Sequence, residues 1–340
     1  MVKRRLNINE VEPRVWVNYF RSLFDRNIAG GTIFETQLWG PPYIEELHRD
    51  FTEQEIKDCL CRTKRSKATG IDGLLAKIWK TFGAKEERLE ILENLFNKIR
   101  IHEVYPEDWK MAIVCPLYKS EGRRRDPGNY REIFLLPAQS KVFSNVLAGG
   151  LRDWLTDKRM VSKFQLGFVK NKRTIDNIFV IKTTVDKYLR EKRGRIYWCF
   201  VDLKKVFDSV NREALWYKRR KKGISEDLVD CIRLMYDGIQ SGVKCGDDLI
   251  REAVDHRVGI RQGCSLSPYL FNAFIDDIMD EVGNGNNHAP TIAKFWIPGQ
   301  LFADNLALGA FTDLGLQMGI GTIVACCSKW NLKCNLENKK

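Results

Sequence analysis

Three aspartates stand where a chemical site could form. Asp202 lies at the end of an apolar stretch rich in aromatic and β-branched residues, residues 196–203, which predicts a buried strand. Asp208 follows six residues later, and Asp304 comes directly after the stretch Gln300 to Ala303. A carboxylate at the end of a buried strand carries a desolvation cost, which a divalent cation can compensate. Two such carboxylates from adjacent strands can hold a pair of Mg²⁺ ions for phosphoryl transfer. The alternative is that each aspartate caps a turn or a helix, and spacing alone does not decide.

A glycine-containing segment lies between these aspartates. It runs from Gly259 to Pro268 (GIRQGCSLSP) and leads into an apolar helix, for which Pro268 suits the first turn. Backbone without side chains could approach a base pair or a nucleotide closely. The alternative is an ordinary junction between a loop and a helix.

The elements that must position these residues follow from periodicity. Apolar residues at helical spacing predict many helices, and short runs of β-branched and aromatic residues predict strands. The expected helices cover part of 1–50, a segment starting at Thr52 with capping-box spacing to Glu55, and 74–82, 86–101, 141–157, 177–189, 211–222, 226–238, 268–282 and 312–330. The expected strands are 111–117, 196–203, 241–245 and 248–254, with a hairpin of 295–297 and 299–302 that closes before Ala303. Long helices mixed with short, partly antiparallel strands favour an α+β fold.

Composition narrows the class of protein. The chain has 340 residues, of which 44% are hydrophobic, so it is not a disordered chain. Its formal net charge of +12 favours a polyanionic partner such as nucleic acid. The ten cysteines form no paired CxxC array, which indicates reduced thiols of an intracellular protein. Without a secretory signal or an apolar run long enough to span a bilayer, we expect an intracellular protein, cytoplasmic or nuclear, with no membrane contact. The sequence gives no indication of the oligomeric state.

The ordered set of motifs resembles a known family. FVDLKKVFD (200–208), GIRQGCSLSPYLF (259–271) and FADN (302–305) are similar to the three palm motifs of reverse transcriptases, most closely those of non-LTR retrotransposons. Supporting matches run outward in the order that the family shows. They are SKATGIDGL (66–74), PEDWKMAIVCPLYKSEGRRRDPGNYREIFLL (106–136), QLGFVKNKRTIDNIF (165–179) and WNLKCNLENKK (330–340).

The resemblance implies a right-hand polymerase fold with an antiparallel palm sheet backed by helices. It covers about 50–340 and implies fingers over about 51–195 and a palm over about 196–340, with the thumb missing. Residues 1–50, where apolar residues fall at helical spacing, are expected to form an N-terminal helical extension. The implied activity is RNA-directed DNA synthesis: two Mg²⁺ ions, with Mn²⁺ as a substitute, promote transfer of a dNTP to a primer 3′-hydroxyl on an RNA template. The implied alternative is a catalytically inactive remnant that at most binds nucleic acid.

The resemblance also assigns roles to residues. It makes Asp202 and Asp304 the catalytic metal ligands, joined by the main-chain carbonyl of Val201 or Leu203. It places Phe207 against the sugar of the incoming dNTP. The remaining implied residues are Gln262 and Gly263 along the nascent pair, Arg131, Lys170 and Arg173 as cations for the triphosphate, Lys333 or Lys339 near the leaving pyrophosphate, and Asp208 and Asn305 as further members of the motifs.

The sequence departs from the family pattern at four places. Asn305 stands where the family has a second aspartate, which removes one negative charge from the expected metal site. Glu132 and Phe134 replace a usual proline and serine, and Val206 replaces a usual alanine beside Phe207. The chain also stops soon after the last motif. These departures favour the inactive alternative for this copy.

Overall fold

The computed structural model describes residues 11–26, 49–63, 68–158, 160–190, 194–246, 248–283 and 288–335. The chain divides into two compact units, and each is built from two separate stretches. Unit 1 comprises residues 1–151 and 219–267, and unit 2 comprises residues 152–218 and 268–340. The described architecture is α+β, as the mixture of expected elements indicated.

Unit 1 contains a four-stranded sheet in the order β2-β1-β4-β5. Its strands are β1 (Met111–Tyr118), β2 (Tyr130–Leu135), β4 (Gln240–Cys245) and β5 (Asp248–Asp255). β1 pairs antiparallel with β2 and parallel with β4, and β4 pairs antiparallel with β5. The sequence did not predict β2, because it continues directly from a charged loop.

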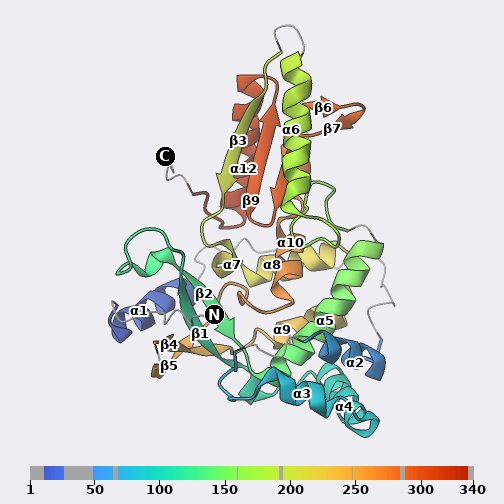
Figure 1. Ribbon diagram of the computed structural model, residues 1–340, viewed down its shortest axis with the longest axis vertical. Helices are drawn as coiled ribbons and strands as arrows, with labels where there is room; N and C mark the ends of the chain where they lie inside the picture. The colour runs from blue at the N-terminus through green and yellow to red at the C-terminus, as the bar shows by residue number, and fades with distance from the viewer. Residues whose placement is uncertain are drawn as a thin grey trace, which may run out of the picture. The chain divides into compact units, whose positions relative to one another are not determined.

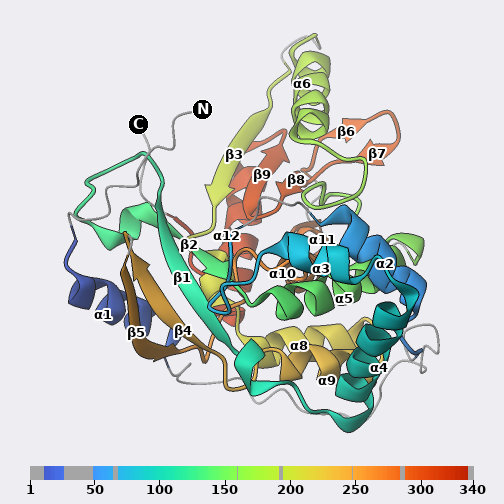
Figure 2. The ribbon, with the colours of Figure 1, turned by 60° about the horizontal axis from the view of Figure 1, so that its bottom comes forward.

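Helix α1 (Pro13–Phe24) belongs to the core of unit 1. It contacts β4 and β5, as Figure 2 shows for β5. Trp16 is fully buried and meets the ring of Tyr130 edge to face, with the centroids 4.9 Å apart. Phe24 stacks on His256, with the centroids 4.3 Å apart. The apolar face of this helix is therefore buried against the sheet.

Unit 1 contains further helices, two of which meet in an aromatic cluster. The further helices are α2 (Glu53–Arg62), α3 (Ala76–Phe82), α4 (Glu86–His102), α9 (Glu226–Leu234), most of α5 (Ala138–Asp157) and the end of α8 (Arg212–Lys221), with single turns η2 (Glu107–Trp109) and η3 (Pro127–Asn129). Phe96 and Phe143 are completely buried and pack edge to face, 5.1 Å between centroids. The spacing of the apolar residues in 86–101 predicted the helix that supplies Phe96.

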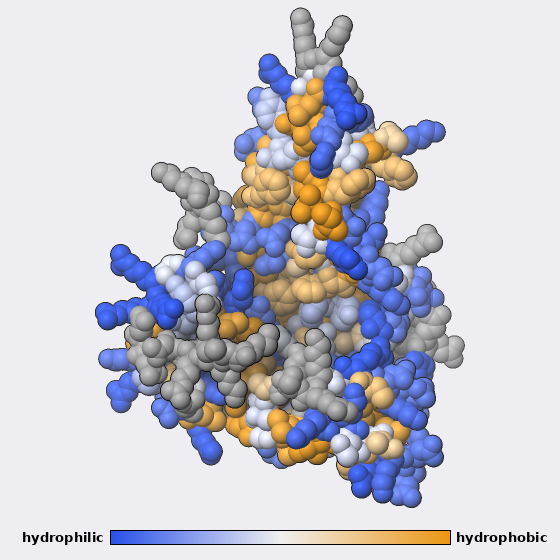
Figure 3. Space-filling view, viewed as in Figure 1, coloured by the Kyte–Doolittle hydropathy of each residue, from blue (hydrophilic) through white to orange (hydrophobic). Residues whose placement is uncertain are grey.

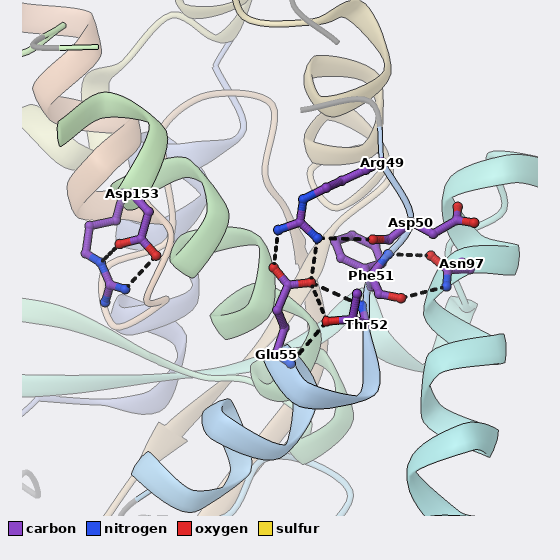
Figure 4. A network of polar contacts seen from close by, with 8 residues as sticks. Arg49, Asp50, Phe51, Thr52, Glu55, Asn97 and Asp153 are labelled. Atoms are coloured by element: carbon purple, nitrogen blue, oxygen red, sulfur yellow. Dashed lines mark hydrogen bonds and ion pairs between the residues drawn. The ribbon is translucent and has the colours of Figure 1, made fainter. Parts of the chain in front are cut away.

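The start of α2 shows why the chain turns helical at this point. Thr52 and Glu55 form a reciprocal capping box, in which each side chain bonds to the main chain of the other. Asn97 then holds the preceding residue, because its side chain both accepts from the amide of Phe51 and donates to its carbonyl. Figure 4 shows this network with Arg49 on Glu55. The capping box predicted from the sequence and the tertiary contact with Asn97 both fix the start of α2.

Unit 2 contains a three-stranded antiparallel sheet in the order β3-β9-β8. Its strands are β3 (Tyr197–Asp202), β8 (Gly299–Phe302) and β9 (Asn305–Ala310). Helix α12 (Asp313–Lys329) packs on β3 and β9 (Figure 1), and α6 (Thr174–Arg190) packs along β8. The other elements are α7 (Val206–Ser209), the start of α8, α10 (Ser267–Ile275), α11 (Ile278–Gly283), and the short pair β6 (Thr291–Ile292) and β7 (Phe295–Trp296).

The expected hairpin of residues 295–297 with 299–302 is wrong. β7 pairs with β6, and β8 pairs with the following strand β9. The sequence of β9, NLALGA, is poor in β-branched residues, so its strand character was not visible. It becomes a strand because it is the central one: Leu306, Ala307 and Leu308 are buried between two partners. Its small residues have a packing role, since a side chain at Gly309 would press on the ring of Trp198.

The single helix expected over 268–282 is also wrong, because α10 and α11 are separate. The ammonium group of Lys218 donates to the carbonyl oxygen of Phe274 at 2.7 Å and to the carboxylate of Asp277 at 2.6 Å. In a continuous helix that carbonyl would accept from residue 278. Lys218 is 5% exposed, although the basic run that contains it is typical of a solvated helix end.

Two further properties follow from the side chains and the helix lengths. All ten cysteines are free thiols, and half of them are buried. Within the described ranges, no helix has both the length and the apolar character that a membrane crossing requires. Figure 3 shows that apolar side chains occur among the charged ones near α6 and β3, where Phe179, Leu189 and Phe200 are exposed.

Candidate active site at the end of the three-stranded sheet

Two of the three candidate aspartates lie at one end of the sheet in unit 2. Asp202 is the last residue of β3 and is paired across the sheet with Asn305, the first residue of β9. Asp304 directly precedes Asn305 in the turn between β8 and β9. Asp202 is exposed, and Asp304 is half-buried. The fold thus brings together two carboxylates that are about one hundred residues apart in the sequence, through register rather than sequence proximity.

The turn that carries Asp304 has an uncommon backbone. Phe302 and Asn305 form the closing pair, so Ala303 and Asp304 are its two central residues. Ala303 has φ +58°, whereas Asp304 has a negative φ. A positive φ at the first central position only is the pattern of a type II′ turn, which normally favours glycine there. Alanine in this conformation carries a steric cost of about 1–2 kcal/mol, so the surroundings of Ala303 must hold it.

Asp202 is supported by a segment near the described end of the chain. The amide of Asn335 donates to the main-chain oxygen of Asp202 at 2.8 Å, and its side-chain Nδ2 donates to Oδ2 of the same aspartate at 3.3 Å. The next pair is an antiparallel bridge between Leu203 and Cys334, followed by a bond from the Lys204 amide to the Lys333 oxygen. The segment 333–335 therefore extends the sheet beside the end of β3.

Asp208, the third candidate, faces a different environment. It lies on the short helix α7 and is 3% exposed. Its charge acts on Lys205, the residue before α7. The pKa of Lys205 is lowered to about 8, because burial lowers it more than the nearby carboxylate of Asp208 raises it. The structure therefore places Asp208 in the interior near the half-buried Lys205, while Asp202 and Asp304 lie at the sheet end.

Phe207 lies on α7 next to Asp208 and is half-buried. Its ring stacks on Phe271 with the centroids 4.8 Å apart and meets Phe168 edge to face at 6.4 Å. This packing fixes the ring five residues after Asp202. The neighbouring Val206 is 2% exposed, so the valine that replaces the family's alanine is accommodated in the interior.

The candidates in unit 1 lie around β2. The main-chain oxygen of Gln262 accepts from the amide of Phe134 at 2.9 Å. Gly263 is exposed and has φ +105°, a conformation that side chains rarely adopt. Arg131 is exposed on β2 opposite Leu117. Arg131 therefore lies on β2, and Gln262 and Gly263 lie on a loop that is hydrogen-bonded to β2.

The remaining cationic candidates are on the surface of unit 2. Lys170, Arg173 and Lys333 are all exposed. The amide of Arg173 bonds to the carboxylate of Asp176 at 2.7 Å, which fixes the start of α6 and leaves the guanidinium outside that bond. Lys339 lies outside the described residues.

The donor set fits a divalent cation that prefers oxygen. The end of the sheet presents the carboxylates of Asp202 and Asp304 and the amide oxygen of Asn305, which are the ligand types of Mg²⁺. Across the described part of the chain, no group of three or more histidine, cysteine, aspartate or glutamate side chains could hold a metal ion. Any ion here would thus keep several ligands from water or from substrate phosphates, as Mg²⁺ commonly does.

Sequence reasoning missed two residues next to these aspartates. Asn335 holds Asp202, and Gln165 bonds to the main chain of Ala303, the residue before Asp304. Both lie inside segments that resemble family motifs, which was the available signal. Their partners are distant in the sequence, so the contacts themselves could not be deduced.

Comparisons with known proteins identify the family of this chain. A family profile described as reverse transcriptase (RNA-dependent DNA polymerase) matches residues 119–339. A probable RNA-directed DNA polymerase from transposon BS of Drosophila melanogaster is 25% identical over 298 residues, covering 83% of this chain and 31% of that protein. A Pol polyprotein from the type-1 retrotransposable element R2 of Nasonia vitripennis is 27% identical over 286 residues, covering 83% and 26%.

One solved structure is also similar to this chain. Apo telomerase from Candida tropicalis, truncated from its C-terminal domain, matches with a TM-score of 0.49 and 12% identity over 81% of this chain and 57% of that one. The two retrotransposon relatives are much longer than the region they share with this chain, which spans 31% and 26% of their lengths.

Proposed function

Because this chain belongs to the reverse transcriptase family, with the right-hand polymerase fold and the antiparallel palm sheet of that family, we propose that it carries out RNA-directed DNA synthesis for a non-LTR retrotransposon. The reaction adds a deoxynucleotide to the 3′-hydroxyl of a DNA primer annealed to an RNA template. The expected partners are the template, the primer and dNTPs. The net charge of +12 suits the phosphate backbone of such a duplex.

The observation that supports this proposal best is the pairing of Asp202 with Asn305. It places Asp202 and Asp304 at the same end of one sheet, which supports the proposal that both hold the same ions. Two Mg²⁺ ions, when bound there, would supply the charge that activates the primer hydroxyl and stabilises the leaving pyrophosphate. Asp202 and Asp304 would hold them, with the main-chain carbonyl of Val201 or Leu203 as a further oxygen.

The other residues bind and orient the substrates. The fixed ring of Phe207 would pack against the deoxyribose and exclude a 2′-hydroxyl by its bulk. Arg131, Lys170 and Arg173 are the candidates for neutralising the triphosphate, and arginine suits this role because its planar group binds phosphate oxygens in pairs. Gln262 and Gly263 would follow the nascent base pair, and Lys333 would assist the leaving group. These roles depend on positioning and electrostatics, which dominate phosphoryl transfer.

A second function is favoured by one residue. Asn305 is exposed at the position paired with Asp202, and it carries an amide where the family has a carboxylate. Two divalent ions bring four positive charges to a site with only two carboxylates, so metal affinity should be lower. The alternative is therefore a reverse transcriptase fold that binds nucleic acid without synthesis.

Primer extension separates these two functions. Poly(rA) primed with oligo(dT) would be incubated with dTTP in Mg²⁺ and, separately, in Mn²⁺. The native chain would be compared with Asn305→Asp and Asp304→Ala, each shown to be folded by circular dichroism. Extension by the native chain that is lost in Asp304→Ala supports the polymerase. Extension by Asn305→Asp alone supports an intact scaffold disabled at one charge. Extension in none of the three, with the duplex still bound, supports the binding function.

A further inference from the structure

The side chain of Gln165 is bonded to the turn that carries Asp304. Gln165 lies in the segment before α6 and is 1% exposed. Its Oε1 accepts from the amide of Ala303 at 3.1 Å and from the amide of Gly167 at 2.8 Å. Its Nε2 donates to the carbonyl oxygen of Ala303 at 3.3 Å. Both main-chain polar groups of Ala303 are thus held by one buried amide.

The backbone around Gln165 is bonded to β8 as well. The amide of Leu166 donates to the oxygen of Leu301 at 2.9 Å, and the amide of Leu301 donates to the oxygen of Phe164 at 2.8 Å. Gln165 and Leu301 form a parallel bridge. The segment 164–167 therefore lies along the strand that leads into the turn, and its register fixes where the amide of Gln165 can reach.

Gly167 allows this approach. A Cβ added at Gly167 would lie 2.2 Å from the nitrogen of Ala303, a distance that no side chain tolerates against backbone. Its carbonyl oxygen is held by the buried Asn272, whose Nδ2 donates to it at 2.8 Å. The glycine is therefore a close-contact position, and its backbone is fixed independently.

These contacts explain the conformation of Ala303. A non-glycine residue with positive φ persists only when its surroundings over-determine it. Here the two bonds from Gln165 and the contact with Gly167 act on Ala303 itself, one residue before Asp304. The direction in which Asp304 leaves the turn follows from the conformation that they impose.

We propose that Gln165, assisted by Gly167, is a positioning residue that holds the Ala303–Asp304 turn so that the Asp304 carboxylate faces the metal site. This inference rests on the proposed function, because it takes Asp304 as a metal ligand. Because Gln165 is 1% exposed, we expect it to act through the turn and not by contact with metal or substrate. The competing explanation is that Gln165 merely stabilises the interior of unit 2.

Asn177 provides a matched control for that explanation. It is a buried amide, 8% exposed, that donates to the oxygen of Leu301 at 3.1 Å, two residues before Ala303. That oxygen also accepts from Leu166, so it stays bonded when the Asn177 amide is lost. Replacement of either residue by an apolar one of similar size removes a buried side-chain amide that bonds to the main chain of β8 or of the turn after it. Only replacement of Gln165 releases the turn.

The experiment compares Gln165→Met, Asn177→Leu and Asp304→Ala with the native chain. Mn²⁺ affinity is measured by calorimetric titration, exchange of the 299–306 amides by hydrogen–deuterium exchange, and folding by the thermal midpoint. We expect Gln165→Met to weaken Mn²⁺ binding about tenfold, the low end of what loss of a residue supporting a ligand costs, and to speed exchange through Asn305. Asn177→Leu should lower the thermal midpoint and leave both other measurements within about twofold of the native chain.

The outcomes separate the inference from the proposed function. If Gln165→Met is folded, binds Mn²⁺ as tightly as the native chain and leaves exchange at Asp304 and Asn305 unchanged, the positioning role is refuted. Equal losses of Mn²⁺ affinity in Gln165→Met and Asn177→Leu would also refute it, since both would then act through general stability. If Asp304→Ala does not alter Mn²⁺ binding, the proposed metal site is wrong, and the exchange comparison still decides whether Gln165 holds the turn.

Discussion

Replacement of Asn305 by aspartate should destabilise the protein without metal and strengthen its binding of Mg²⁺. Asn305 is paired with Asp202 across antiparallel strands, and paired residues have Cβ atoms about 4.5–5.5 Å apart. Two unit charges at about 5 Å repel by about 0.8 kcal/mol in bulk water and by about 3 kcal/mol at an effective dielectric constant of 20. Because both side chains are exposed, the cost should lie near the lower value, about 1 kcal/mol.

When Mg²⁺ is bound, the new carboxylate becomes stabilising, because its attraction to the doubly charged ion exceeds its repulsion from Asp202. We expect a net gain of about 1–2 kcal/mol in binding, or roughly 5- to 30-fold in affinity. Thermal unfolding would be recorded in chelator and in saturating Mg²⁺, and affinity would be measured by calorimetry. Asn305→Asp should melt about 1–2 °C below the native chain in chelator and gain more from Mg²⁺ than the native chain does.

Asn331→Asp is the matched control, since it makes the same change at an exposed position on the turn after α12. It should respond to Mg²⁺ as the native chain does. The electrostatic reasoning fails if Asn305→Asp is as stable as the native chain in chelator and its Mg²⁺ affinity is unchanged. It also fails if Asn331→Asp gives the same gain, because the effect would then be one of net charge.

Trp16→Ala should lower the free energy of unfolding by about 3–5 kcal/mol, measured by urea denaturation, because the side chain is fully buried; Val15→Ala, at an exposed neighbour, should change it by less than about 1 kcal/mol. The pKa of Lys205 is lowered to about 8, mainly by burial, so between pH 8 and the usual lysine value the unfolded chain binds one proton more than the folded chain. The cost of burying the charged form therefore fades as pH rises through that window. The free energy of unfolding of the native chain should thus rise relative to that of Lys205→Met between about pH 8 and pH 10, and a constant difference across this range would contradict the assignment. Asn335→Ala should weaken Mn²⁺ binding by roughly tenfold, because it removes the side-chain bond to Asp202, whereas Ser328→Ala should not; equal effects would exclude a specific role. Phe207→Val should raise the use of ribonucleotides relative to deoxyribonucleotides by at least about tenfold in primer extension, and an unchanged ratio would show that the ring does not face the sugar.

Local chemistry was sufficient to predict much of this protein. The apolar stripe of 86–101, the capping box at Thr52 and the β-rich stretch before Asp202 each predict an element that the structure contains. The order of the motifs indicated the family. These inferences succeed because periodicity, caps and motifs are properties of neighbouring residues.

Tertiary structure alone decided which residues meet. β9 is a strand because it pairs on both sides, not because of its own residues. Asp208 resembles Asp202 in the sequence, yet it is buried beside Lys205 while Asp202 is exposed at the sheet end. The contacts of Gln165 with Ala303 and of Asn335 with Asp202 join residues more than one hundred positions apart. Hydrogen bonds and packing over such separations depend on strand register, which no local pattern of residues specifies.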